Sequence, residues 1–310
     1  NEAIKLAPQE SSLFNDRGGV YTELNDLTAA MKDFGAAIRL DPDNASAHYN
    51  KGVGFAKLGQ PDRAAQHFQE ALRLDPGNTN LISSRASAYG DLGKAREAIK
   101  QYEEAIRLDP TNATLYVERA NLHSAIGDFA NAVSDYSKAL EIVPGSVRVY
   151  SNRGKAYSEL HEYERAVLDF DKAISLDLKN PRLYTSRGSA YYELNVLETA
   201  IEDFDEAIRL SPGFAEAYNS RGLAFIQLED YELATEDFNI AIQINPEYSE
   251  AYHNRGYTYH RVGDYEQALG DYGEAIRLNP EFTDAYSSRG ITYLYIGRFD
   301  LAISNYDMAI

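Results

Sequence analysis

The chain has 310 residues, of which 44% are hydrophobic and 25% charged, and this composition is typical of a folded protein with a buried core. It contains no cysteine, which excludes disulfides, thiolate metal sites and cysteine nucleophiles. Acidic residues outnumber basic ones by 48 to 30, and a formal net charge of -18 disfavours nucleic-acid binding. The composition leaves the compartment open, with a cytoplasmic location favoured and an extracytoplasmic one compatible.

Prolines recur every 34 residues along the chain. If this proline is position 32 of a unit, repeats span 11–44, 45–78, 79–112, 113–146, 147–180, 181–214, 215–248 and 249–282. Residues 1–10 are then the end of a truncated repeat, and residues 283–310 are a partial one. We expect residues 1–310 to form a single array. The proline series is Pro8, Pro42, Pro76, Pro110, Pro144, Pro212, Pro246 and Pro280.

Each repeat predicts two helices. Positions 4, 8 and 11 are apolar, aromatic or small and share one helical face, and positions 20, 24, 27 and 28 share a second. Turn formers stand between them at positions 15 to 17, and Pro61 fits the first residue of a second helix. Glycine or alanine at position 8 and alanine at positions 20 and 27 predict close approach between the helices.

This pattern resembles the tetratricopeptide repeat family over essentially the whole chain. The resemblance implies an all-α fold, a right-handed α-solenoid or superhelix of 34-residue helix–turn–helix repeats. It also implies a concave groove, lined by the first helices, that binds a protein or peptide partner. No phosphate loop, glutamate-paired zinc motif or nucleophile elbow is present, so we expect no enzyme activity, cofactor or metal. The sequence contains no apolar run of about 18 residues, so it predicts no membrane insertion of this segment.

Position 7 departs from the family, in which it is usually a large apolar residue. Here it is lysine or arginine in every repeat, and position 23 is aspartate in six of them. His67, Gln101 and Asn305 stand at position 23 in the other three. The recurrence favours a structural ladder of ion pairs, while a row of arginines facing an acidic ligand is the alternative. The ladder includes Arg153, Arg187, Arg221 and Arg255, with Asp169, Asp203, Asp237 and Asp271.

Two stretches of the inner face are candidate ligand sites. The central one is basic and polar, and could hold a carboxylate or an acidic peptide: Asn121, Arg148, Asn152, Lys155 and Arg182. In the family's clamp for chaperone tails, Asn121, Asn152 and Arg182 match three positions, but Val117 and Ser186 replace two cations. The second stretch is an apolar strip, which is either a docking surface for a peptide or a surface that the curvature of the superhelix or a following helix buries. It comprises Leu223, Ile226, Tyr257, His260, Ile291, Leu294 and Tyr295.

Two irregularities lead to further expectations. Leu178 stands where proline is expected, so the second helix of that repeat is predicted to run on to Asn180, before Pro181. Asn1 and Ile310 fall at positions 25 and 28, inside second helices. We therefore expect a segment of a longer array, or self-association of terminal repeats into an end-to-end filament. The two competing functions are a non-catalytic protein-interaction scaffold and this self-assembling filament.

Overall fold

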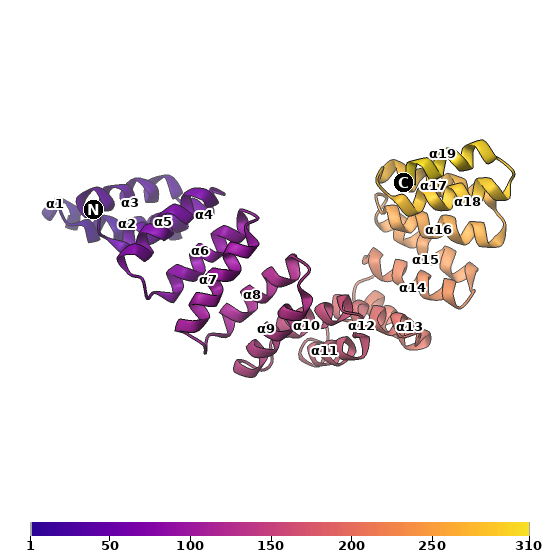
Figure 1. The fold of residues 1–310 in the computed structure, drawn as a ribbon, viewed down its shortest axis with the longest axis horizontal. Helices are drawn as coiled ribbons and strands as arrows, with labels where there is room; N and C mark the ends of the chain where they lie inside the picture. The colour runs from indigo at the N-terminus through magenta and orange to yellow at the C-terminus, as the bar shows by residue number, and fades with distance from the viewer. Residues whose placement is uncertain (1, 310) are drawn as a thin grey trace. The chain divides into compact units, whose positions relative to one another are not determined.

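The computed structural model describes residues 2–309, which form nineteen helices and no strand (Figure 1). Asn1 and Ile310, on which the expectation about broken terminal repeats rests, lie outside the described residues. The chain divides into two compact units, residues 1–149 and 150–310, and helix α10 (Val147–Glu159) crosses the division.

The first unit contains α1 and four helix pairs, and each helix from α2 to α8 packs against the next. Every first helix begins at position 1 of a repeat and every second helix at position 17. The helices are α1 (Glu2–Leu6), α2 (Ser11–Glu23), α3 (Leu27–Leu40), α4 (Ala45–Lys57), α5 (Pro61–Leu74), α6 (Thr79–Asp91), α7 (Ala95–Leu108), α8 (Ala113–Ala125) and α9 (Phe129–Ile142).

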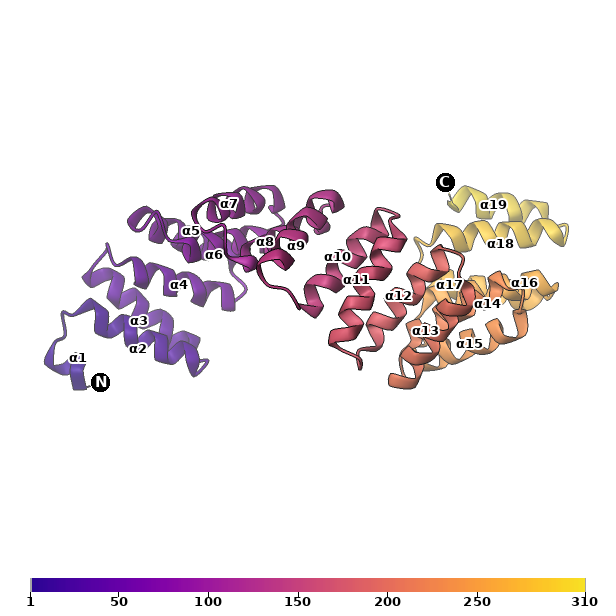
Figure 2. The same cartoon turned by 90° about the horizontal axis from the view of Figure 1, so that it is seen from below.

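The second unit continues the same alternation, and each helix from α11 to α18 packs against the next (Figure 2). Its helices are α11 (Tyr163–Leu176), α12 (Pro181–Glu193), α13 (Leu197–Leu210), α14 (Ala215–Gln227), α15 (Tyr231–Ile244), α16 (Ser249–Val262), α17 (Tyr265–Leu278), α18 (Thr283–Tyr295) and α19 (Phe299–Ala309). The predicted all-α solenoid is confirmed in both units.

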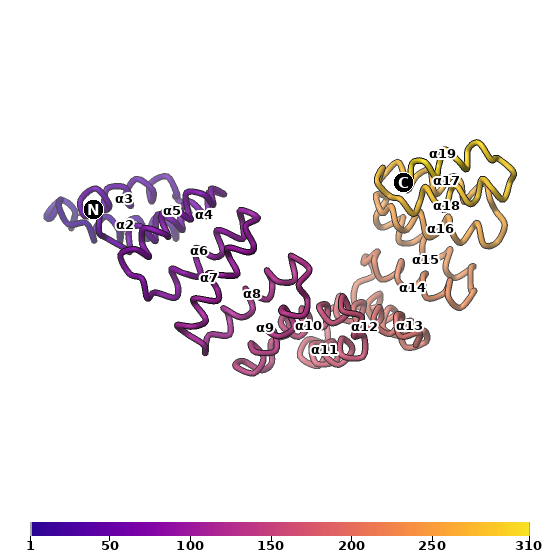
Figure 3. The backbone as a smooth tube through the Cα atoms, viewed as in Figure 1, coloured from indigo at the N-terminus to yellow at the C-terminus, as the bar shows by residue number. Residues whose placement is uncertain are grey.

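First helices of successive repeats also touch one another: α2 contacts α4, α12 contacts α14, α14 contacts α16 and α16 contacts α18. In these repeats the first helices therefore pack side by side, and the tube trace in Figure 3 follows the short turns that connect first and second helices. Position 15 of all nine turns has a positive φ, between 58° and 85°. This left-handed residue reverses the chain within a few residues, and five of the nine are glycine.

The core is built from the positions that repeat most strictly. Position 20 is a fully buried alanine in every repeat, and Phe238 at position 24 is fully buried as well. A Cβ atom added at Gly222 would lie 2.7 Å from the Phe238 ring. The small residue at position 8 is therefore required mainly by the aromatic ring at position 24 of the same repeat.

The prediction that the helix before Pro181 runs on to Asn180 is wrong. Helix α11 ends at Leu176, at the same position of the repeat as its neighbours α9 and α13. The Asn180 side chain caps α12 by accepting a hydrogen bond from the Arg182 N–H, which fixes Asn180 outside the preceding helix. The Leu178 carbonyl accepts a 3.3 Å hydrogen bond from the Tyr184 hydroxyl, as the Pro110 carbonyl does from Tyr116 at 3.2 Å. The turn is thus kept without the proline.

Candidate functional site

Position 7 and position 23 form a two-bond ion pair in each repeat that has an aspartate. In Arg221, Nε lies 2.8 Å and Nη2 2.7 Å from the two carboxylate oxygens of Asp237. The aspartates are almost fully buried, with Asp237 only 3% exposed, so the fork-shaped pairing is what makes their burial tolerable. The same geometry holds for Arg17–Asp33, Arg119–Asp135, Arg153–Asp169, Arg187–Asp203 and Arg255–Asp271.

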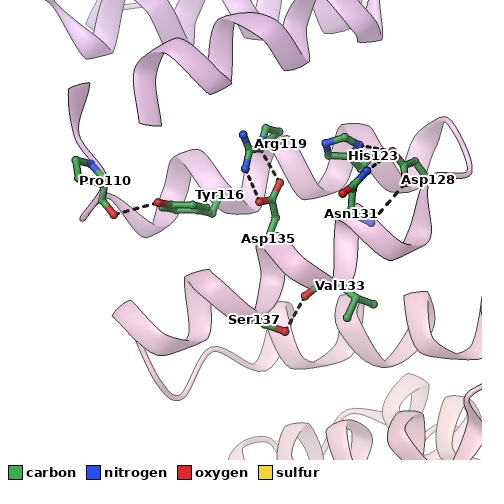
Figure 4. A network of polar contacts seen from close by, with 9 residues as sticks. All are labelled: Pro110, Tyr116, Arg119, His123, Asp128, Asn131, Val133, Asp135 and Ser137. Carbon is green, nitrogen blue, oxygen red and sulfur yellow. Dashed lines mark hydrogen bonds and ion pairs between the residues drawn. The ribbon is translucent and has the colours of Figure 1, made fainter. Parts of the chain in front are cut away.

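Aromatic rings flank these guanidinium groups, as their spacing predicts. The Arg221 guanidinium lies 5.7 Å from the centre of the Tyr218 ring and 5.8 Å from that of Phe225. Rings at positions 4 and 11 therefore flank the Arg221 cation while the aspartate neutralises it, and for Arg119 and Arg187 the flanking ring is the one at position 4. Figure 4 shows one such repeat, with Arg119 donating to Asp135 beside Tyr116.

A second partner reaches some of these arginines from the preceding repeat, and the sequence analysis missed it. Nη1 of Arg187 lies 2.5 Å from Asp171, and Nη1 of Arg255 lies 2.6 Å from the Asn239 side-chain oxygen. Arg221 makes the equivalent contact with Asp205. All three partners occupy position 25. The carboxylates of Asp203 and Asp171 both raise the pKa of Arg187 by hydrogen bonding to its guanidinium.

Three repeats lack this compensation: in the last one Arg289 donates to the Asn305 side-chain oxygen at 2.7 Å, and the other two are consecutive. Arg85 hydrogen-bonds the Gln101 side-chain oxygen, and its buried Nε has no hydrogen-bond partner among residues 2–309. Lys51 stands beside His67, whose Nδ1 lies 3.3 Å from Nδ1 of His48. Burial, with Lys51 and His48 nearby, lowers the pKa of His67 to about 4. At neutral pH the His67 ring is uncharged. Its protonation would add a second positive charge beside Lys51, so His67 cannot neutralise Lys51 in either state.

The central basic and polar residues fall in both units. In the first unit, Asn121 accepts a 2.7 Å hydrogen bond from the Tyr136 hydroxyl and donates to Glu118 at 3.4 Å. Arg148 lies 3.8 Å from the same Glu118. In the second unit Asn152 is partly buried, Lys155 is exposed, and the Arg182 guanidinium lies 5.5 Å from the Phe214 ring centre. Glu118 is thus a carboxylate of the chain itself beside Asn121 and Arg148.

The predicted apolar strip lies on α14, α16 and α18 of the second unit. Leu223, Ile226, Tyr257 and His260 are partly buried, whereas Ile291, Leu294 and Tyr295 are 43%, 44% and 68% exposed. The His260 ring packs edge-on against Tyr295, with 4.9 Å between ring centres. His260 also hydrogen-bonds the Thr292 hydroxyl through Nδ1 at 3.0 Å, and burial lowers its pKa.

A hydrogen-bonded row between first helices is a further feature that the sequence analysis missed. The amide of Asn254 donates to Asn219 at 3.0 Å, and Asn50 donates to Asn15 at 2.9 Å. His253 and Ser288 are joined at 3.0 Å in the same way. Each bond links position 5 of one repeat to position 6 of the next, which fixes the register of neighbouring first helices. Polar residues recur at positions 5 and 6 in the sequence, and this recurrence could have predicted the row.

Residues 2–309 contain no group of three or more His, Cys, Asp or Glu side chains arranged to hold a metal ion. No helix within this range is long and apolar enough to cross a membrane.

Comparison with known proteins supplies independent evidence on the fold. Family models described as tetratricopeptide repeat match residues 2–79, 113–145, 147–180 and 249–282. A model described as TPR repeat matches residues 86–127, 188–228 and 222–263. A search of curated proteins found no match.

Many solved structures are similar to this chain. A tetratricopeptide repeat protein from Parabacteroides merdae is 21% identical, with a TM-score of 0.67 over 80% of this chain and 98% of its own. The Cut9–Hcn1 hetero-tetramer of the APC/C matches at 16% identity and a TM-score of 0.59, over 86% of this chain and 52% of that one. MamA is 26% identical, with a TM-score of 0.47, over 52% of this chain and 95% of its own. With the family models matching along both units, the chain belongs to the tetratricopeptide repeat family.

Proposed function

We propose that the chain is a non-catalytic protein-interaction scaffold that binds a peptide segment of a partner on the apolar strip of its second unit. The observation that supports this proposal is the exposure of Ile291, Leu294 and Tyr295 next to the aromatic contact of Tyr295 with His260. Contiguous exposed apolar side chains on a folded surface commonly mark a binding site. Rigid aromatic side chains give large contact area at little entropic cost, which suits them as anchors.

Selection of phage-displayed peptides on the full chain tests this proposal. We expect peptides with apolar or aromatic anchors, and at least a tenfold loss of their affinity on replacing Ile291 and Tyr295 together by serine. Ile303→Ser is the matched control, because Ile303 is 60% exposed on α19 and lies outside the strip. Selected peptides that bind both variants equally well would contradict the proposal.

Self-association is a second candidate, supported by the outer side of α19. Phe299, Ile303 and Met308 are 60% or more exposed, whereas Val167 and Ile99, at the same position of the repeat as Ile303, are 8% and 7% exposed. In those repeats the next first helix packs against the helix that carries this side chain. Light scattering over a wide concentration range would show growth that Ile303→Ser prevents. Monomers at every concentration would rule this function out.

A further inference from the structure

Repeats 2 and 3, residues 45–78 and 79–112, are less acidic than most of the chain. Residues 45–112 contain nine basic and eight acidic residues, a formal net charge of +1 in a chain of -18. Residues 150–310 contain 14 basic and 28 acidic residues, a net charge of -14. An anionic partner is therefore repelled less at repeats 2 and 3 than over most of the chain.

The same two repeats carry two of the three ladder cations that lack a carboxylate; the third, Arg289, donates to the Asn305 side-chain oxygen. Arg85 has Gln101 at position 23 and Gln69 at position 25 of the preceding repeat, where Arg187 has Asp203 and Asp171. Lys51 has His67 and Gly35 at these positions. Among residues 2–309, no carboxylate lies within 4.0 Å of the charged nitrogens of either side chain. A partly buried cation without a counter-charge stabilises a carboxylate brought to it.

Each of these cations lines an open pocket. The Arg85 pocket, of about 290 Å³, lies where α6 meets α5 and is also lined by Gln69, Arg73 and Glu104, with Leu72 and Ile82 as apolar walls. The Lys51 pocket, of about 440 Å³, lies where α4 meets α3, and Arg63 is its second cation. Its apolar wall is formed by Leu27, Met31, Phe55 and Leu58. Both pockets have room for a side chain from outside, and both offer a cation next to apolar surface.

We infer that repeats 2 and 3 bind an acidic segment of a partner protein, whose carboxylates take the places that the position-25 aspartates Asp171 and Asp205 occupy in other repeats. One carboxylate pairs with Arg85 in the α5–α6 pocket, as Asp171 pairs with Arg187, and another pairs with Lys51 in the α3–α4 pocket. Apolar side chains of the same segment pack on the pocket walls. This surface is separate from the apolar strip of the second unit, so it does not depend on the function proposed above.

Decaglutamate labelled with fluorescein is the probe, titrated with the full chain and followed by fluorescence anisotropy. Gln69→Asp places an internal carboxylate where Asp171 stands relative to Arg187, and we expect it to weaken binding at least tenfold while the fold is retained. Gln66→Asp makes the same change of charge at an exposed position on the same helix and is expected to weaken binding less than twofold. Glu104→Gln removes a repelling carboxylate from the pocket and should tighten binding.

Two further variants separate this site from general charge attraction. Arg85→Gln removes the cation and should weaken binding as much as Gln69→Asp, whereas Tyr295→Ser, in the apolar strip, should leave binding unchanged. Circular dichroism of each variant checks that the helices are intact. The inference is overturned if the unmodified chain does not bind decaglutamate at ~0.15 M salt, or if Gln69→Asp and Gln66→Asp weaken binding equally.

Discussion

The ion pair of Arg221 and Asp237 holds two charges where the family usually places an apolar side chain at position 7. Asp237 is 3% exposed, and two hydrogen bonds from Arg221 stabilise its buried carboxylate. A buried pair of this kind contributes little beyond an apolar pair of the same volume, but removing one partner leaves an unpaired charge in the core. Each ladder pair is therefore costly to break but adds little to stability over an apolar pair.

This view predicts a strongly non-additive mutant cycle. Arg221→Met is expected to lower the free energy of unfolding by about 3 kcal/mol, because Asp237 stays buried without its partner. The double variant Arg221→Met with Asp237→Leu should recover most of that loss. Urea denaturation followed by circular dichroism measures both. Arg209→Met, which breaks the exposed pair with Glu206, is the control and should change stability by less than about 1 kcal/mol. Additive losses would refute the prediction.

The pairs within a repeat could be predicted from the sequence, but those between repeats could not. Arg221 and Asp237 are separated by a constant interval that recurs along the chain, so their pairing follows from two antiparallel helices. The contact of Asp205 with Arg221, and that of Asn219 with Asn254, depend on how one repeat is rotated on the next. The 34-residue period contains no information about that rotation. For the same reason the sequence could place Tyr295 on the inner face but could not assign it His260 as a neighbour.

At the scale of the helix, the turn residue at position 15 shows where local sequence and fold disagree. The backbone there is left-handed in all nine repeats, yet Asn25, His161, Asn195 and Glu229 are not glycine. Asparagine tolerates this conformation through its short polar side chain, whereas glutamate does not. By residue type, Glu229, with a φ of 61°, is therefore the most strained residue at position 15.

Glu229→Gly is expected to stabilise the second unit by about 1 kcal/mol, since relief of left-handed strain outweighs the larger chain entropy of glycine. Thermal unfolding of the full chain measures the effect as a rise in melting temperature. The reverse change, Gly263→Ala, where φ is 85°, should lower it. An unchanged or lower melting temperature for Glu229→Gly would show that the turn at Glu229 carries no strain.

At the scale of the whole molecule, the two units differ in charge far more than in fold. Residues 1–149 contain 20 acidic and 16 basic residues, a net charge of -4, against -14 for residues 150–310. Repulsion among like charges destabilises a compact state, and salt screens it. The stability of the helices in the second unit should therefore depend more strongly on ionic strength than the stability of those in the first.

Amide hydrogen exchange of the full chain, resolved by peptide, tests this difference. On raising NaCl from about 0.02 M to about 0.5 M, we expect protection to increase more in the helices from α11 to α19 than in those from α2 to α9. Sodium sulfate would also strengthen apolar burial in both units, so chloride is the better salt for this comparison. An equal increase in both units would mean that net charge does not limit the stability of the second unit.

The constant interval within each Arg–Asp pair also bears on how the chain folds. Six such pairs, from Arg17–Asp33 to Arg255–Asp271, close a loop of the same length wherever they occur along the chain. The entropy lost in closing each loop is therefore the same for the first repeat as for the last. Such local contacts give a low contact order, and proteins of low contact order fold rapidly. A nascent chain of this design can complete each pair as soon as one repeat has left the ribosome, so lengthening the array adds to its reach without slowing the closure of any single repeat.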